Sequence, residues 1–240
     1  MRLHRFYIEQ KVGEQKEVTL SDQDLIHQLS KVFRLKSGDE IVIFDGSGFE
    51  YVSQIIFITK KELSLKIISA SSRPEENKKV ILYLALIKKG NFELAVEKAT
   101  ELGVTEIHPI ISERSEKKGI NMERLQKIVK EASEQSGRLK LPLIYPHLTL
   151  ETVVSQQKSQ NEVPVVFHTT TPAADGHPSL NKEGKGNVAV FVGPEGGWSE
   201  KEIELFKKNN FQFCSLGQNI LRAETAAIIS VFLATQKLSR

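Results

Sequence analysis

The chain of 240 residues is poor in cysteine, with one, and in tryptophan, with one. Cys214 alone cannot form an internal disulfide, and no cysteine cluster is left for a structural zinc or iron–sulfur site, so we expect no metal. Long apolar runs are also lacking. The longest, residues 226–234, includes a serine and is far shorter than the roughly 20 residues of a membrane span. No apolar segment follows the N-terminal arginines, as it would in a signal peptide. These absences predict a cytoplasmic protein without membrane contact.

Neither sign of charge dominates, because 33 basic residues face 30 acidic ones and the net charge is +3. A charge this small does not by itself indicate a nucleic-acid partner. Residues 114–140 hold eight basic and four acidic residues, a modest basic region. That region is as compatible with a solvated helix face as with a surface that follows phosphates.

A polar segment with a proline, residues 69–79, separates two different patterns and predicts a domain boundary, with one domain at 1–72 and another at 73–240. The first domain has strand-like runs and one helix from an N-cap at Ser21 to Arg34, which predict a small, mostly β, barrel-like domain. Its expected strands are residues 3–8, 40–44, 49–58 and 62–68, with a turn at 45–48.

The second domain alternates apolar runs with amphipathic helices, which is typical of a mainly parallel sheet covered on both faces. The fold class is therefore α/β. The expected strands are residues 80–87, 104–111, 141–145, 163–169, 188–192 and 211–216. The expected helices are residues 92–102, 121–132, 148–157, one from a capping box of Ser199 with Glu202, and 224–238.

A glycine-rich loop, residues 193–198 (G-P-E-G-G-W), follows one expected strand directly. In an open parallel sheet, ligands bind beyond the carboxyl ends of the strands. Three glycines in five residues cost stability, so they indicate positive φ angles or a ligand close to the main chain. The loop has neither of the common phosphate-binding patterns, and Glu195 favours hydroxyls, an adenine edge or a cation over a phosphate.

A second loop, residues 216–226 (L-G-Q-N-I-L-R-A-E-T-A), also joins a strand to a helix. Taken alone, Glu224 is a favourable first-turn charge and Arg222 a surface residue. Taken with the first loop, they indicate a ligand site.

These two loops resemble the cofactor-loop motifs of the ribosomal RNA uracil-N3 methyltransferases, in the SPOUT superfamily of trefoil-knotted enzymes. Further segments resemble that family in the same order along nearly the whole chain: residues 4–6, 27–38, 44–46, 98–104, 112–115 and 134–138. The resemblance implies an N-terminal PUA-like RNA-binding barrel, a knotted domain that binds S-adenosylmethionine, and a homodimer. It also implies that the product is N3-methyluridine in 16S ribosomal RNA of the small ribosomal subunit.

The resemblance also suggests which residues act. Arg222 is the expected catalytic residue, because its fork of donors can stabilise the negative charge that develops on uracil O2 and O4. The expected cofactor-binding residues are His168, Thr169, Val192, Gly193, Glu195, Gly196, Gly197, Leu216, Gly217, Ile220, Leu221, Arg222 and Glu224. The expected RNA-binding residues are Arg5, Arg34, Lys36, Arg114 and Arg138. The chain departs from the family at Phe33, at Asn91-Phe92, and in lacking a glutamate near His168.

Two questions stay open at the level of sequence. The base that removes the N3 proton could be Glu195, Glu224 or a water molecule. Two other functions are a non-catalytic ribosome-assembly factor, which would not need the glycines and Arg222, and a nucleotide-binding protein, which Glu195 disfavours.

Overall fold

The computed structural model describes residues 3–73, 78–116, 119–157, 162–168 and 186–238. The chain forms two compact units. The first consists of Met1–Glu75 with Ser133–Leu141, and the second of Glu76–Ala132 with Pro142–Arg240. The sequence predicts a C-terminal domain at 73–240, which would include the segment Ser133–Leu141.

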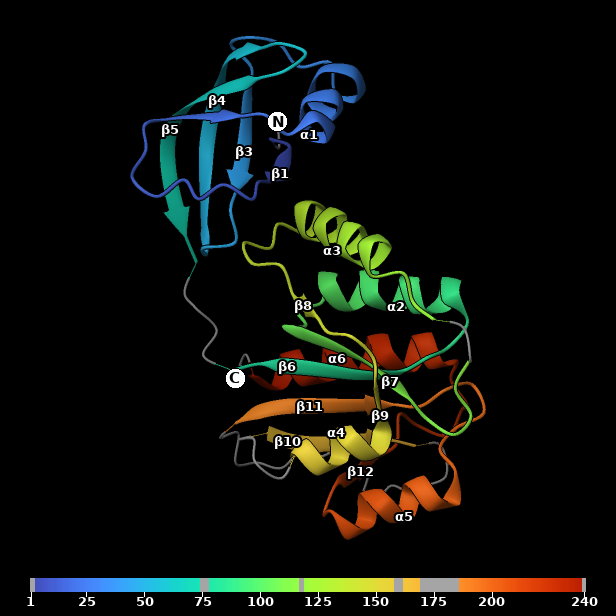
Figure 1. Ribbon diagram of the computed structural model, residues 1–240. Coiled ribbons are helices and arrows are strands. Elements are labelled where there is room, and N and C mark those ends of the chain that lie inside the picture. Colours follow the sequence, from blue (N-terminus) through green and yellow to red (C-terminus); the bar gives the residue numbers. More distant parts are fainter. Residues whose placement is uncertain (1–2, 74–77, 117–118, 158–161, 169–185, 239–240) are drawn as a thin grey trace. The chain divides into compact units, whose positions relative to one another are not determined.

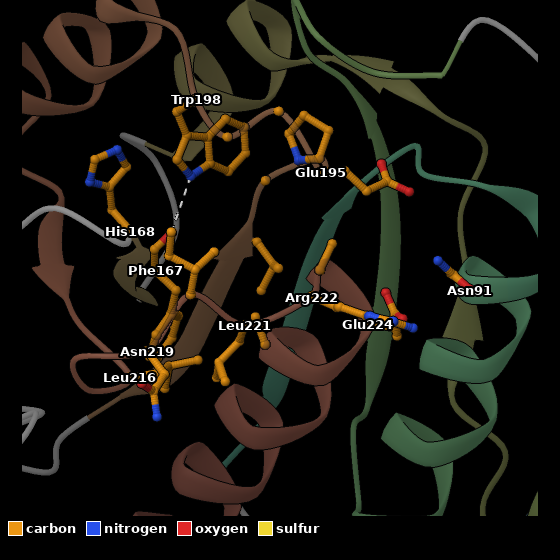
Figure 2. Close-up of a pocket in the computed structure, with 18 of the residues that line it drawn as sticks. Asn91, Phe167, His168, Glu195, Trp198, Leu216, Asn219, Leu221, Arg222 and Glu224 are labelled. Carbon is orange, nitrogen blue, oxygen red and sulfur yellow. Dashed lines mark hydrogen bonds between the residues drawn. The ribbon is translucent and has the colours of Figure 1, made fainter.

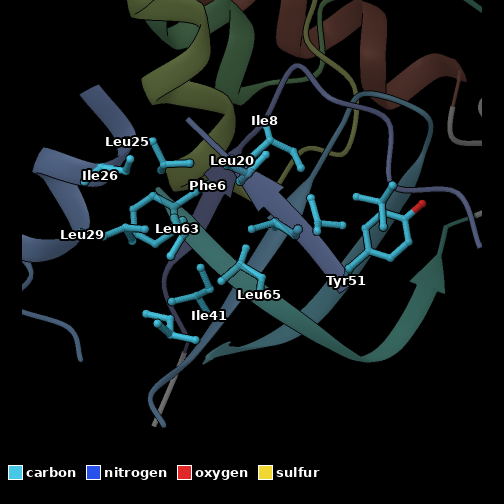
Figure 3. Packing of buried hydrophobic residues seen from close by; sticks show 14 residues of the cluster. Phe6, Ile8, Leu20, Leu25, Ile26, Leu29, Ile41, Tyr51, Leu63 and Leu65 are labelled. Carbon is cyan, nitrogen blue, oxygen red and sulfur yellow. The ribbon is translucent and has the colours of Figure 1, made fainter. Parts of the chain in front are cut away.

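The first unit is built on a mixed five-stranded sheet in the order β1-β3-β4-β5-β2 (Figure 1). Strand β1 is parallel to β3, and the other neighbours are antiparallel. The core on this sheet contains Phe6, Leu20, Ile41 and Leu65 (Figure 3). The bounds are β1 (Arg5–Tyr7), β2 (Glu17–Leu20), β3 (Glu40–Phe44), β4 (Phe49–Ile58) and β5 (Leu63–Ser72).

Two predictions in this unit need correction. The expected linker at 69–79 begins too early, because β5 continues to Ser72. The helix N-cap is Asp22 and not Ser21: an Asp22 carboxylate oxygen accepts hydrogen bonds from the backbone N–H groups of Asp24 and Leu25 at 2.9 and 3.1 Å. A carboxylate is the better acceptor for the free N–H groups of the first turn.

The helix that follows is irregular. It consists of α1 (Gln23–His27) and a π-helical turn, η1 (Gln28–Val32). Directly after it, Arg34 has a φ of 55°, which is uncommon for a residue with a side chain. The exposed Arg34 thus has a left-handed backbone conformation that is unfavourable by itself, so the surrounding structure must stabilise it.

The end of α3 (Met122–Ser136) and the residues that follow it belong to the first unit. The backbone N–H of Tyr7 in β1 donates a hydrogen bond to a carboxylate oxygen of Glu134 at 2.9 Å. Further on, Leu139 is buried, and the Lys140 side chain packs over Gly48. The first unit therefore combines two separate parts of the chain.

The second unit contains a sheet of seven parallel strands in the order β12-β10-β11-β6-β7-β8, with β9 also paired to β7 (Figure 1). The α/β fold class is confirmed. Residues 148–149, expected to begin a helix, instead form a short strand. The bounds are β6 (Val80–Ala85), β7 (Glu106–Ile111), β8 (Leu143–Ile144), β9 (Leu148–Thr149), β10 (Glu162–Phe167), β11 (Asn187–Val192) and β12 (Gln212–Cys214).

Helices cover both faces of this sheet, as the apolar alternation predicted. On one face, α6 packs against β6 and β11 and also against α2. On the other, α4 and α5 share a core with Tyr83 and Phe191, whose rings stack at 4.4 Å. Asn121 caps α3, and the capping box of Ser199 with Glu202 is confirmed. The bounds are α2 (Lys89–Glu101), α4 (Leu150–Gln157), α5 (Glu200–Lys208) and α6 (Ala223–Leu238).

Within the described residues, no helix is long and apolar enough to cross a membrane. In the same ranges, no group of three or more metal-ligating side chains lies close enough to hold an ion. The trefoil knot stays a prediction.

Candidate functional site

The site lies at the carboxyl edge of the parallel sheet in the second unit. Strands β12, β10, β11 and β6 are consecutive neighbours, so the segments that follow them meet at one edge. Together with the N-terminal turns of α2 and α6 they line a cavity of about 690 Å³ (Figure 2). A cavity of this size is in the range of small-molecule and cofactor sites.

The structure brings the two predicted loops together on this cavity. Of the thirteen residues expected to bind a cofactor, Thr169 lies outside the described residues and the other twelve line the cavity. Arg222, the expected catalytic residue, is among them and is exposed. That these residues bind a ligand stays a prediction.

Several lining residues were missed. Lys88 and Asn91 come from the start of α2, after β6, where the sequence has no glycine cluster. They reach the cavity because β6 lies beside β11 in the sheet. The sequence alone does not give this strand order, so it could not predict the two residues. The other missed residues adjoin those predicted: Phe167, Pro194, Trp198, Ser215, Asn219, Ala223 and Ala226.

The glycines of the first loop serve different purposes. Gly197 has a φ of 68° at the end of a turn in which its N–H donates to the Pro194 carbonyl at 2.8 Å. Gly193 lies against the Trp198 indole, so closely that a Cβ atom would be 3.0 Å from the ring. The indole N–H donates to the Phe167 carbonyl at 3.3 Å, which links this loop to the end of β10 (Figure 2).

Arg114, expected to contact RNA, contacts the glycine-rich loop, and its contact with RNA stays a prediction. Its guanidinium Nη1 donates to the Gly196 carbonyl at 2.8 Å, and its alkyl chain packs on Gly196. Next to it, the Glu113 N–H donates to the buried Glu202 carboxylate at 2.8 Å. The same carboxylate also accepts from the Ser199 N–H at 2.7 Å. Residues 113–114 therefore fix the position of the loop.

The charged groups of the cavity differ in their environment. Burial, and then the charge of Lys207, lower the pKa of His168, so its imidazole is neutral at pH 7. Glu195 is exposed and accepts a hydrogen bond from the Lys88 backbone N–H at 3.2 Å. Glu224 is buried, and within the described residues its Oε2 atom accepts no hydrogen bond.

Comparison with known proteins identifies the family. An RNA methyltransferase domain model matches residues 74–235, and an RNA methyltransferase PUA domain model matches residues 20–68. The ribosomal RNA small subunit methyltransferase E of Rickettsia conorii is 33% identical over 233 residues, which cover 96% of this chain and 94% of that protein. The chain belongs to the ribosomal RNA small subunit methyltransferase E family.

Solved structures of family members have the same fold. A methyltransferase E from Neisseria gonorrhoeae bound to S-adenosyl methionine is 27% identical and covers 99% of this chain and 98% of its own, with a TM-score of 0.86. A putative methyltransferase from Legionella pneumophila, in complex with bound SAM, is 28% identical, covers 98% of both chains and has a TM-score of 0.84.

The cavity of this methyltransferase E family member fits the chemistry of that cofactor. S-adenosylmethionine has an adenine ring with flat faces that pack on apolar surface, ribose hydroxyls and a positive sulfonium. Phe167, Leu216 and Leu221 offer apolar surface, while Glu195 offers a carboxylate to the sulfonium, and Figure 2 shows these side chains around one space. Opposite charge in a partly buried site favours a cation.

The other predicted RNA-binding residues of the family member lie in the first unit. Arg34 and Lys36 are exposed. Arg5 is half-buried, and its Nε atom pairs with a Glu50 carboxylate oxygen at 3.4 Å. Arg138 is half-buried as well. Arg34 and Lys36 are therefore the members of the set best exposed to a phosphate.

Proposed function

We propose that this protein transfers a methyl group from S-adenosylmethionine to N3 of a uridine in 16S ribosomal RNA, giving N3-methyluridine. Membership of the methyltransferase E family supports the reaction. The observation that carries the proposal is the meeting of the two motif-bearing loops on one cavity, with Arg222 and Glu224 at its wall.

The described residues predicted to bind the cofactor, with the exception of Glu224, would hold it in this cavity. When bound, S-adenosylmethionine supplies an activated methyl group on a positive sulfur, so the protein mainly has to align donor and acceptor. The contacts of Arg114 with Gly196 and of Trp198 with Phe167 keep the loop in place for that alignment.

The acceptor needs more help than the donor. Uracil N3 carries a proton, and its loss places negative charge on O2 and O4. Arg222 is exposed at the cavity wall, where its guanidinium can donate to such an oxygen. Arg222→Ala is expected to lower the rate of methyl transfer while RNA affinity is retained.

The uridine must leave its stack to reach the methyl group, so the protein has to hold RNA of a particular shape. We propose that the first unit does this with Arg34 and Lys36, with Arg5 and Arg138 as weaker candidates. A homodimer and a cytoplasmic location are part of the proposal, and sedimentation of the purified protein tests the first.

Two measurements test the proposed function. The first is calorimetric titration with S-adenosylmethionine, with ATP as the comparison ligand. Wild-type protein should bind S-adenosylmethionine and should not bind ATP. Gly196→Arg should abolish binding because the new side chain enters the loop at Arg114, where a Cβ already lies 3.3 Å from Cδ. Gly119→Arg is the control, because Gly119 does not line this cavity and has open space around it.

The second measurement is nucleoside mass spectrometry of small ribosomal subunits that lack N3-methyluridine, after incubation with protein and cofactor. Formation of N3-methyluridine supports the proposal. Binding of RNA without cofactor binding would favour an assembly factor, and binding of ATP alone would favour a nucleotide-binding protein. Either of these results contradicts it.

A further inference from the structure

The carboxylate of Glu224 stands in an unusual environment. The residue is 6% exposed, in the first turn of α6, and lines the cavity. Its Oε2 atom accepts no hydrogen bond from the part of the chain that the structure describes. A buried acceptor without a donor costs about 1–3 kcal/mol, and more when it is charged, so such a group in a ligand site indicates that the ligand supplies the donor.

The other carboxylate of the cavity differs on each count. Glu195 is exposed to water, and Lys88 N–H already donates to its Oε1 atom. Water and a backbone donor satisfy Glu195 before any ligand binds. Glu224 is therefore the carboxylate of this cavity with an oxygen atom that still lacks a hydrogen-bond donor among the described residues, and a ligand can supply one.

The polar side chains that share the cavity with Glu224 match the hydrogen-bonding groups of one edge of uracil. That edge presents a carbonyl, the N3–H and a second carbonyl, which is an acceptor, a donor and an acceptor in a row. The matching protein edge places an acceptor between two donors. The Arg222 guanidinium and the Asn91 carboxamide are two such donors, and both line the same cavity as the Glu224 carboxylate (Figure 2).

We propose that Glu224 accepts the N3 proton of the target uracil, with Arg222 and Asn91 donating to the two flanking carbonyl oxygens. This inference rests on the proposed function. As the N3–H bond breaks, its electron pair stays on the imide and the proton bonds to a Glu224 oxygen. N3 then takes the methyl group of the sulfonium, whose C–S electron pair goes to sulfur, and Glu224 releases its proton to water.

Glu224→Gln is the main variant, since an amide of the same shape still accepts a hydrogen bond through its carbonyl but cannot take the proton. Single-turnover methyl transfer should fall about 10²- to 10⁴-fold, the usual contribution of a general base. The Kd for S-adenosylmethionine, measured by calorimetry, should stay within about twofold of wild type, a change well below the tenfold that 1.4 kcal/mol represents. Glu204→Gln, on the exposed surface of α5, is the matched control and should leave both quantities unchanged.

Two further readouts separate proton transfer from a structural role. With 5-fluorouridine at the target position, whose N3–H is more acidic, the deficit of Glu224→Gln should shrink. Without cofactor, wild-type protein should bind RNA containing uridine about tenfold more tightly than RNA containing N3-methyluridine, because the methyl group cannot donate. Glu224→Ala and Asn91→Ala should each reduce that preference.

Three results overturn the inference. Wild-type single-turnover rates in Glu224→Gln would show that the proton goes elsewhere. Loss of S-adenosylmethionine affinity with an unchanged uridine preference would make Glu224 a cofactor ligand. An equal deficit with uridine and 5-fluorouridine would give it a structural role. Wild-type protein that binds the cofactor but leaves the uridine unmodified contradicts the proposed function itself, before any variant is compared.

Discussion

A single methyl group, added in turn to three glycines of the loop at residues 193–197, should have three different effects. At Gly193 the new Cβ would lie 3.0 Å from the Trp198 ring, closer than at least nine in ten such contacts in folded proteins. The indole cannot move away freely, because it is 4% exposed, packs against Phe206 and donates to the Phe167 carbonyl. Overpacking of this kind costs about 1–3 kcal/mol.

Alanine at the other two glycines should change the free energy of unfolding by smaller amounts. Gly197→Ala meets no atom within 4 Å but must adopt a φ of 68°, at a cost of about 1–2 kcal/mol. Gly196→Ala meets only the exposed Arg114 side chain at 3.3 Å, which can shift, and its φ is not in the left-handed region. A lower entropy of the unfolded chain offsets that contact by about 0.4–1 kcal/mol, so the net change should be small.

Thermal unfolding and calorimetric titration with S-adenosylmethionine measure the series. Since 1 kcal/mol corresponds to about 2–4 °C in a protein of this size, Gly193→Ala should lower Tm by several degrees and Gly196→Ala by less than about two. Gly193→Ala should also weaken cofactor binding most, because Trp198 lines the cavity. A decrease in Tm and in cofactor affinity as large in Gly196→Ala as in Gly193→Ala would refute the reasoning, since the steric difference between the two sites would then have no effect.

Four further predictions follow from single side chains. Asp45→Asn should lower the free energy of unfolding by about 1–3 kcal/mol, because the buried carboxylate accepts hydrogen bonds from Ser47 and from Val12 N–H. Burial alone would raise the pKa of Asp45, but these hydrogen bonds outweigh burial and hold the pKa below its usual value. The stabilisation is therefore present above about pH 4 and is lost as the pH falls through the pKa of Asp45 in the folded protein. In urea unfolding between pH 2 and 6, the free energy of unfolding should depend less on pH in the variant than in wild type. Burial raises the pKa of Cys214 to about 11, so a thiol reagent at pH 8 should modify it only after denaturant is added; rapid labelling of native protein would contradict this. Arg114→Ala should raise the Kd for S-adenosylmethionine, with partial recovery in Arg114→Lys, and an unchanged Kd in the alanine variant would mean that the contact with Gly196 does not position the loop. Removing the exposed charge of Arg34 should reduce the salt dependence of RNA binding by about one unit of slope, as a lost phosphate contact does, and an unchanged slope excludes the contact.

The fold was largely predictable where the pattern was long. Strands β3 and β4 have the predicted bounds, because apolar residues mark both and a glycine-containing turn joins them. Strand β2 was missed because its four residues contain only two buried apolar side chains, Val18 and Leu20. Residues 133–141 were assigned by their place in the chain, whereas contacts such as Tyr7 N–H with Glu134 decide where they pack.

The part of the site formed by the two loops was predictable, because loops of unusual composition that follow strands can be recognised in the sequence. Both motif-bearing loops do so, and the structure puts them on one cavity. Asn91 does not, because its place on this cavity depends on β6 lying next to β11, a property of strand order. The contact of Arg114 with Gly196 was not predictable either, because it depends on the place of Arg114 after β7; its contact with RNA stays a prediction.

The return of residues 133–141 to the first unit has a consequence for how the protein is made. When synthesis has reached residue 75, all five strands of the first sheet exist, but the acceptor for Tyr7 N–H and the buried Leu139 do not. The unit can reach its final packing only once residue 141 has left the exit tunnel, after β6, α2, β7 and α3 have been synthesised. The first unit thus completes its folding only after the first third of the second unit has been synthesised, and a fragment cut at residue 75 should be less stable than the same residues in the whole chain.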